Sequence, residues 1–217
     1  MANNVRQINS SDQFESPTSF MSPSRGRIYS DIPMSAKEVR AVGKIIRPNS
    51  LFLGKKAKEE YFKQEASDFG TIHLATHCFI DESRPMYCEI AFAQDDDPAE
   101  DGLLYTYEVF NLDLNAELVT LSACETGLGK LSRGEGLIGL TRAFMYAGAS
   151  SVLVSLWSVD ESTGELMEPF YTAIQENKTK AEALRMAKLE LIKTTKNGIS
   201  FSHPYLWAPF ILVGQWE

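Results

Sequence analysis

Residues 116–124, "AELVTLSAC", form a nearly continuous apolar run that ends at a cysteine. Such a run predicts a strand buried on both faces, as in the parallel sheet of an α/β protein. A glycine-containing turn, "ETGLG", follows at 125–129, and a helical pattern occupies 134–149. This order of strand, turn and helix places Cys124 at the carboxyl end of a strand, where ligands bind in sheets of this kind.

Strands and helices alternate along most of the remaining chain. The capping boxes "SAKE" at Ser35 and "STGE" at Ser162 predict the starts of two helices. Alternation of this kind predicts an α/β fold with a mainly parallel sheet and helices on both faces. The other predicted strands are 50–54, 70–76, 150–157 and 209–215, and the other predicted helices are 57–66 and 179–193.

Two parts of the chain fall outside this alternation. Residues 85–115 predict a hairpin insertion, because strand-like "CEIAFA" and "GLLYTYE" flank the acidic turn "QDDDPAEDG". Residues 1–30 are rich in Ser, Asn and Pro and have no periodicity, which predicts a disordered tail or linker. The sequence therefore predicts one folded domain at 31–217, a size that can bury a substantial core.

Composition and charge argue against several classes of function. The net charge is −8, from 21 basic and 29 acidic side chains. Neither nucleic acid nor an anionic membrane surface is an expected partner, because both attract Lys/Arg clusters. No apolar run reaches the roughly 18 residues of a transmembrane helix, and no signal-peptide pattern follows Met1. Three cysteines cannot all pair, so we expect reduced thiols and a cytoplasmic location.

The stretch "TIHLATHC", residues 71–78, raises the question of a metal site. His73 and His77 have the i, i+4 spacing of zinc ligands on a helix, but their Ile, Leu and Thr neighbours favour a strand. On a strand, positions i and i+4 lie about 13 Å apart, which is too far for one ion. We therefore expect no metal there, and we expect His73 to be a buried strand histidine with a backbone partner.

Cys124 and His77 both stand where a predicted strand ends. Free backbone N–H groups in the turn after Cys124 can hold an oxyanion, and a neighbouring histidine can move the protons of thiol-based acyl transfer. The two residues are 47 positions apart (124 − 77), room for one long crossover between adjacent parallel strands. The alternative is that Cys124 is inert core packing, the usual role of a free cysteine.

Several stretches together resemble the CHAT domain. They are "IHLATH", "LVTLSACETGLG", "GEGLIGLTRAFMYAGASSVLVSLWSVDE", "FY" at 170 and "HPYLWAPFILVG". This bacterial family of caspase-fold (clan CD) cysteine peptidases is related to separase and is often joined to TPR repeats. The likeness runs from about Ser35 to Gly214. It implies an α/β fold of the caspase-like, three-layer sandwich type and an endopeptidase that works with a Cys/His dyad.

The resemblance also implies roles for individual residues. His77 matches the catalytic histidine and Cys124 the nucleophile, with the backbone N–H groups of Cys78 and Cys124 as the oxyanion hole. A cofactor is not implied. The implied partners are a protein or peptide substrate and a TPR-containing or other regulatory chain. The implied substrate-binding residues are Ser122, Ser155, Trp157, Asp160 and Glu161.

Within that set, Asp160 is the candidate for recognising a basic P1 side chain, and Glu161 is a weaker one. An equally simple interpretation of Asp160 is an acid that stabilises the helix dipole ahead of Ser162. Two departures favour an alternative function, a catalytically inactive caspase-fold interaction module. Cys78 replaces the Gly that usually follows the catalytic histidine, and the family's N-terminal strand is not evident.

The stretch "GEGLIG", residues 134–139, matches the dinucleotide fingerprint G-x-G-x-x-G. In that fingerprint the first Gly follows its strand tightly, so that the pyrophosphate sits on the helix N-terminus. Here about ten residues intervene after Cys124. We therefore interpret these glycines as helix entry and close helix–sheet packing, and nucleotide binding as a weaker alternative.

Overall fold

The computed structural model describes part of the chain in detail. These residues are 5–9, 20–22, 27–29, 32–93, 100–122, 125–126, 135–157, 162–196 and 198–217.

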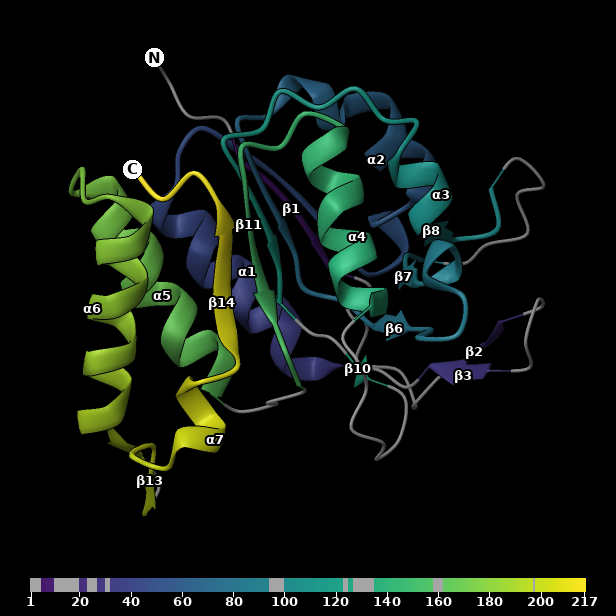
Figure 1. The fold of residues 1–217 in the computed structure, drawn as a ribbon. Helices are drawn as coiled ribbons and strands as arrows, with labels where there is room; N and C mark the ends of the chain where they lie inside the picture. Colours follow the sequence, from purple (N-terminus) through teal and green to yellow (C-terminus); the bar gives the residue numbers. More distant parts are fainter. Residues whose placement is uncertain are drawn as a thin grey trace.

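A six-stranded sheet runs through the centre of the molecule (Figure 1). Its strand order is β14-β11-β9-β5-β1-β4, and every neighbouring pair is parallel except β14 with β11. The mainly parallel sheet predicted from the sequence is therefore confirmed. Its strands are β1 (Val5–Asn9), β4 (Asn49–Leu53), β5 (Thr71–Leu74), β9 (Leu118–Leu121), β11 (Ser151–Ser155) and β14 (Phe210–Gly214).

Helices cover both faces of this sheet, so the fold has three layers (Figure 1). On one face lie α1 (Pro33–Ile45), α5 (Ser162–Gln175) and α6 (Lys180–Lys193). On the other lie α2 (Glu59–Glu65) and α4 (Glu135–Tyr146). Each face has its own apolar core, because the strands are buried on both sides and water is excluded from each side. Examples of the core side chains are Val42, Phe170 and Leu184 on the first face and Phe62, Val119 and Phe144 on the second.

A second sheet lies beside the main one, with the strand order β10-β6-β7-β8. Within the hairpin insertion expected at 85–115, β7 (Glu89–Ala91) and β8 (Leu103–Tyr105) pair antiparallel. The other strands are β6 (Cys78–Ile80) and β10 (Glu125–Thr126). Short elements complete the fold: β2 (Phe20–Ser22), β3 (Arg27–Tyr29), η1 (Gly54–Lys56), η2 (Ala66–Asp68), η3 (Pro85–Tyr87), α3 (Thr106–Val109), β12 (Thr195–Lys196), β13 (Ile199–Ser200) and α7 (Pro204–Trp207).

The N-terminal stretch differs from the expected tail at 1–30. Its first strand, β1, lies inside the main sheet and pairs in parallel with β4 on one side and β5 on the other. Two further pieces, β2 and β3, pair with each other. The strand that was not evident in the sequence is thus present. Five residues without strict alternation give little sequence signal, whereas backbone pairing on both edges stabilises the strand once its neighbours exist.

The predicted capping box at Ser35 is wrong. Helix α1 begins at Pro33. Proline suits the first turn because an N–H at that position would have no acceptor within the helix. Ser35 is inside the helix, and its hydroxyl donates to the carbonyl of Ile32 at 2.6 Å. Glu38 is therefore free of a capping role, and it is buried instead, with 5% of its surface exposed.

Close packing explains the glycine pattern at the start of α4. A Cβ on Gly136 would lie 2.6 Å from Cγ2 of Ile80 and 3.1 Å from Sγ of Cys88. The predicted role of this glycine in helix–sheet packing is confirmed. At the other end of the helix, Gly148 has a φ of +114°, and its N–H donates to the carbonyl of Met145 at 3.2 Å. This is the left-handed C-terminal glycine predicted from the sequence.

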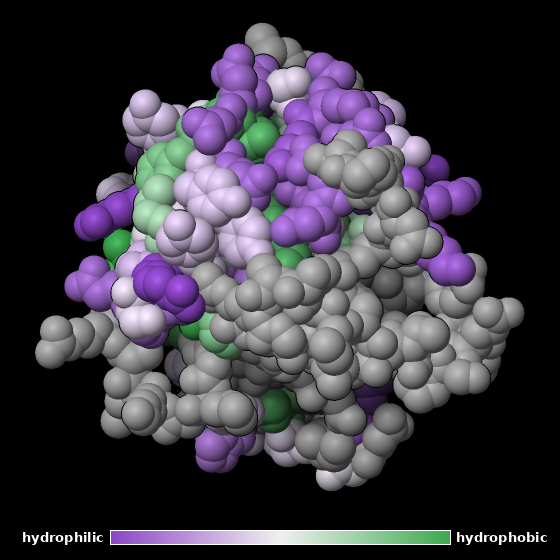
Figure 2. Space-filling view, turned by 90° about the vertical axis from the view of Figure 1, so that its right-hand side faces the viewer, coloured by the Kyte–Doolittle hydropathy of each residue, from purple (hydrophilic) through white to green (hydrophobic). Residues whose placement is uncertain are grey.

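Figure 2 shows the face that carries α3 and β8. The described residues on this face are mostly hydrophilic, with small, separate hydrophobic patches between them. In the part of the chain that the structure describes, none of the helices has both the length and the apolarity to cross a bilayer.

Candidate active site

The candidate site lies at the carboxyl ends of β5 and β9. These strands are parallel neighbours, with Leu74 opposite Leu121 at their ends. Just beyond, the backbone N–H of Ser122 donates to the carbonyl of Leu74 at 2.8 Å. The sequence predicts that the strand before His77 and the strand before Cys124 are parallel neighbours. This adjacency of the two strands is confirmed.

The two segments pair again after they leave the main sheet. Strands β6 and β10 are parallel, and Phe79 lies opposite Glu125. Cys124 lies outside the described residues. However, its neighbours on the two sides, Ser122 and Glu125, pair with Leu74 and Phe79, which bracket His77 in the sequence.

Backbone contacts with β7 hold the segment around His77. The carbonyl of His77 accepts a hydrogen bond from the N–H of Ala91 at 2.8 Å. The hydroxyl of the preceding Thr76 donates to the carbonyl of Ala91 at 2.5 Å. His77 is 8% exposed, so its ring is largely enclosed at the edge of the sheet. The hairpin insertion thus supports the backbone that carries the predicted catalytic histidine.

Cys78 is 3% exposed and belongs to the apolar core that includes Ile80, Ile90 and Leu121. Its side chain therefore packs into the interior and is not a second thiol at the rim of the site. Cys88 is buried in the same core, and burial raises the pKa of its thiol. Among the described cysteines, which are Cys78 and Cys88, neither forms a disulfide.

His73 is fully buried in β5, as the sequence predicted, but the expected backbone partner is wrong. Its Nδ1 lies 3.1 Å from the hydroxyl of Tyr171 on α5. Its Nε2 lies 3.0 Å from Oε1 of Glu38 on α1. The Tyr171 hydroxyl is also 2.8 Å from Oγ1 of Thr120 on β9, and burial raises the pKa of Tyr171. His73 thus joins elements on one face of the sheet.

The hydroxyl of Ser122, a predicted pocket residue, donates to Oε1 of Glu38. Sequence reasoning missed Glu38 because its spacing from Ser35 matched a capping box. A signal was present nevertheless. Glu38 precedes Val42 by four residues, which places a carboxylate on the stripe that α1 buries.

The other predicted substrate-binding residues follow β11. Ser155 is buried, and its hydroxyl donates to the carbonyl of Trp157 at 2.5 Å. The indole N–H of Trp157 donates to the carbonyl of Tyr205 at 2.9 Å, and the two rings stack with their centroids 5.9 Å apart. Trp157 is therefore held against α7. Asp160 and Glu161 lie outside the described residues.

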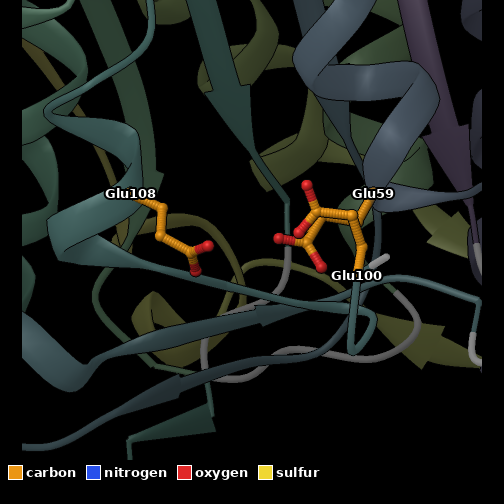
Figure 3. A group of neighbouring side chains, drawn as sticks. All are labelled: Glu59, Glu100 and Glu108. Atoms are coloured by element: carbon orange, nitrogen blue, oxygen red, sulfur yellow. The ribbon is translucent and has the colours of Figure 1, made fainter. Parts of the chain in front are cut away.

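A cluster of three carboxylates, which the sequence analysis did not single out, lies where α2 meets the hairpin insertion and α3 (Figure 3). The side chains are those of Glu59, Glu100 and Glu108, and their nearest oxygens lie within 4.8 Å of one another. Such a group resembles a metal site, but the ammonium of Lys63 already contacts all three, at 2.8, 2.7 and 2.8 Å. The protein therefore supplies its own cation here.

Charges within this cluster perturb one another. Burial raises the pKa of Glu59 to about 7, although Lys63 opposes the shift. Burial alone would lower the pKa of Lys63, but its close contacts with the three carboxylates raise it. Lys63 therefore stays charged at neutral pH, while Glu59 titrates there.

Comparison with known proteins places this geometry in a family. The sequence model of the family described as "CHAT domain" matches residues 4–215. The protein named Tetratricopeptide repeat protein 28 from Homo sapiens is 36% identical over 119 residues, and its Mus musculus counterpart is 35% identical over the same length. These matches cover 54% of the chain but span only 5% of the length of either relative.

A likeness in three dimensions covers nearly the whole chain. The crystal structure of the Saccharomyces cerevisiae separase–securin complex matches 99% of the chain with a TM-score of 0.54. The matched region is 12% of that separase structure's chain, and the sequence identity is 13%. This likeness shows the fold, a caspase-like α/β sandwich, as the sequence analysis predicted.

Proposed function

Because the chain belongs to the CHAT domain family, we propose that it is a cysteine endopeptidase that cleaves protein substrates with a Cys124/His77 dyad. One observation carries the proposal. The segments on either side of Cys124 pair with those on either side of His77, first through Ser122 and Leu74 and then through Glu125 and Phe79. Two such pairings support the proposal that the nucleophile and the base act together at one edge of the sheet.

In the proposed reaction, a substrate segment lies extended along the carboxyl edge of the main sheet. The Cys124 thiolate attacks the carbonyl carbon of P1, and the backbone N–H groups of Cys78 and Cys124 hold the oxyanion. His77 donates a proton to the leaving amine as the C–N bond breaks, which leaves a thioester on the sulfur. Water, deprotonated by His77, then hydrolyses the thioester and releases the acid and the thiol. The reaction needs no cofactor.

For substrate recognition, we propose that Ser122, Ser155 and Trp157 line the binding groove. The hydrogen bond from the Ser155 hydroxyl to the carbonyl of Trp157 and the anchoring of Trp157 against Tyr205 support this proposal, because they hold the segment after β11 in place. Asp160 is the proposed acid that pairs with a basic P1 side chain, with Glu161 second.

A regulatory chain is a further part of the proposal. The human and mouse relatives bear the name of a tetratricopeptide repeat protein, and the chain spans 5% of their length. We propose that tetratricopeptide repeats, in a partner or in the same polypeptide, control access of the substrate to the site.

The second candidate is a caspase-fold interaction module without activity. Cys78 favours it, because the family usually has Gly at that position. The buried side chain of Cys78 weakens this argument, since it packs toward the core.

Peptide-library cleavage by the full chain, with quantification of cleaved bonds by mass spectrometry, tests both candidates. Cys124→Ala and His77→Ala are each expected to lower cleavage by about a thousandfold or more. Matched controls are Cys88→Ala and His203→Ala, whose side chains lie in the core and at the start of α7. Asp160→Ala is expected to remove the preference for Lys and Arg at P1. Cleavage that survives Cys124→Ala would refute the peptidase assignment.

A further inference from the structure

A chain of buried polar side chains lies beneath the carboxyl ends of β5 and β9. It runs from Ser122 through Glu38 and His73 to Tyr171 and Thr120. Each of the five side chains is 5% exposed or less. A buried polar group without a partner costs free energy, so these contacts favour one arrangement of the side chains.

At the end of this chain nearest the candidate site, a hydrogen bond joins Ser122 to Glu38. The Ser122 hydroxyl donates to Oε1, whereas Nε2 of His73 lies 3.0 Å from the same oxygen without the alignment of a hydrogen bond. His73 therefore contacts this carboxylate without donating a hydrogen bond to it. Ser122 is its hydrogen-bond donor.

This link fixes the chain as it leaves β9. The main-chain N–H of Ser122 is bonded to Leu74, and its side chain is bonded to Glu38 from α1. Ser122 thus has two anchors on different elements, and Cys124 follows two positions later in the sequence. A displacement of about 1 Å at a reacting group can lower a rate about a hundredfold, so such anchors matter to catalysis.

Packing alone gives no reason for a carboxylate at position 38. Apolar side chains of similar volume are often as stable as buried charged groups or more stable, because a buried charge loses its hydration. The neighbouring positions Val39 and Val42 on α1 are fully buried and apolar. Glu38 interrupts this apolar stripe, and its carboxylate accepts the hydrogen bond from Ser122.

We infer that Glu38 is a positioning residue, which holds Ser122 and thereby sets the direction in which the chain leaves β9 toward Cys124. This inference rests on the proposed function. It also gives the Ser122 hydroxyl, which donates to Glu38, a role in supporting the nucleophile segment, in addition to the place of this residue in the proposed groove.

Steady-state kinetics of the full chain on its best library peptide test this role. Glu38→Leu and Ser122→Ala are expected to lower kcat about 10- to 100-fold with KM changed by less than about threefold. Glu38→Gln is expected to keep kcat within about threefold of the wild type, because its amide oxygen still accepts from Ser122. The matched control is Ser151→Ala, which removes another buried hydroxyl from the same sheet, bonded to the carbonyl of Glu117 at the opposite edge.

The outcomes separate this inference from the proposed function. A wild type without Cys124-dependent cleavage overturns both. A wild type that cleaves, with unchanged kcat in a folded Glu38→Leu variant, overturns the inference alone, as does an equal loss of kcat in the Gln and Leu variants. If Glu38→Leu does not fold, Ser122→Ala decides: a kcat equal to that of Ser151→Ala, or a change confined to KM or P1 preference, overturns the positioning role.

Discussion

Nδ1 of His73 lies 3.1 Å from the hydroxyl of Tyr171, although the two residues are 98 positions apart. Their rings meet edge to face, with centroids 5.6 Å apart. Because Tyr171 also contacts Thr120, one hydroxyl from α5 connects two neighbouring strands of the main sheet. The centre of this domain is thus held by polar contacts as well as by apolar packing.

Tyr171→Phe is expected to lower the free energy of unfolding by about 1–3 kcal/mol, because it leaves buried groups of His73 and Thr120 without their partner. Urea unfolding followed by circular dichroism measures this change. Tyr146→Phe is the matched control, because Tyr146 is 77% exposed. Equal stabilities of the two variants would contradict the role given to the Tyr171 hydroxyl.

Stability is expected to depend on the protonation of Glu59. Its pKa is raised to about 7 in the folded protein from an ordinary value of 4.5. The folded state therefore binds this proton more tightly than the unfolded state does. The resulting contribution to the free energy of unfolding is fully present below pH 4.5 and is lost as the pH rises to about 7. The difference of about 2.5 units corresponds to roughly 3 kcal/mol.

Glu59→Gln tests this dependence, since it keeps the shape and removes the titration. Urea unfolding at several pH values between 4.5 and 8 is expected to show a flatter profile for this variant than for the wild type. Lys63 remains charged throughout this range, and it still has Glu100 and Glu108 as partners. Glu60→Gln is the control, because the half-buried Glu60 also lies on α2 and accepts a hydrogen bond from Gln64. A Glu59→Gln profile that matches that of this control would argue against the proposed titration.

The three cysteines are expected to differ in reactivity. Cys78 and Cys88 are 3% and 0% exposed, so iodoacetamide does not reach either thiol, and burial also raises the pKa of Cys88. As the proposed nucleophile, Cys124 is expected to react. Mass spectrometry after native labelling at pH 7 should therefore find one modified residue, and all three in denaturant. Native modification of Cys88 ahead of Cys124 would contradict this expectation.

Strand β1 is expected to be essential for the fold, because it pairs with β4 and β5 on its two edges. Gln7→Pro removes a backbone N–H from the middle of this strand, and we expect it to lower the free energy of unfolding by about 1–3 kcal/mol. Asn3→Pro, ahead of the strand, is the control. If thermal unfolding finds the same Tm for both variants, residues 1–30 behave as the tail that the sequence predicted.

Local pattern was enough to predict most elements of the fold. The apolar runs that became β5, β9 and β11 are buried at every position, and such runs are recognised without knowledge of their neighbours. The glycines at the two ends of α4 were interpreted correctly for a similar reason, since turns and close contacts leave a residue-level signal.

The errors arose where one residue type serves two purposes. The spacing of Ser35 and Glu38 satisfies a capping box, but Pro33 starts the helix earlier and Glu38 turns to the core. His73 was recognised as buried, yet its partners are the side chains of Glu38 and Tyr171 rather than the backbone. In each case the local pattern was present and a distant contact decided the outcome.

The sequence by itself determined the alternation of strands and helices, the family, and the candidate pair of His77 and Cys124, because periodicity and motif spacing are properties of neighbouring residues. Only the tertiary structure decided that β1 lies between β4 and β5 and that Glu38 meets Ser122. Contacts of this kind join residues that are dozens of positions apart. They depend on which strands become neighbours, and that order follows from the packing of the whole chain.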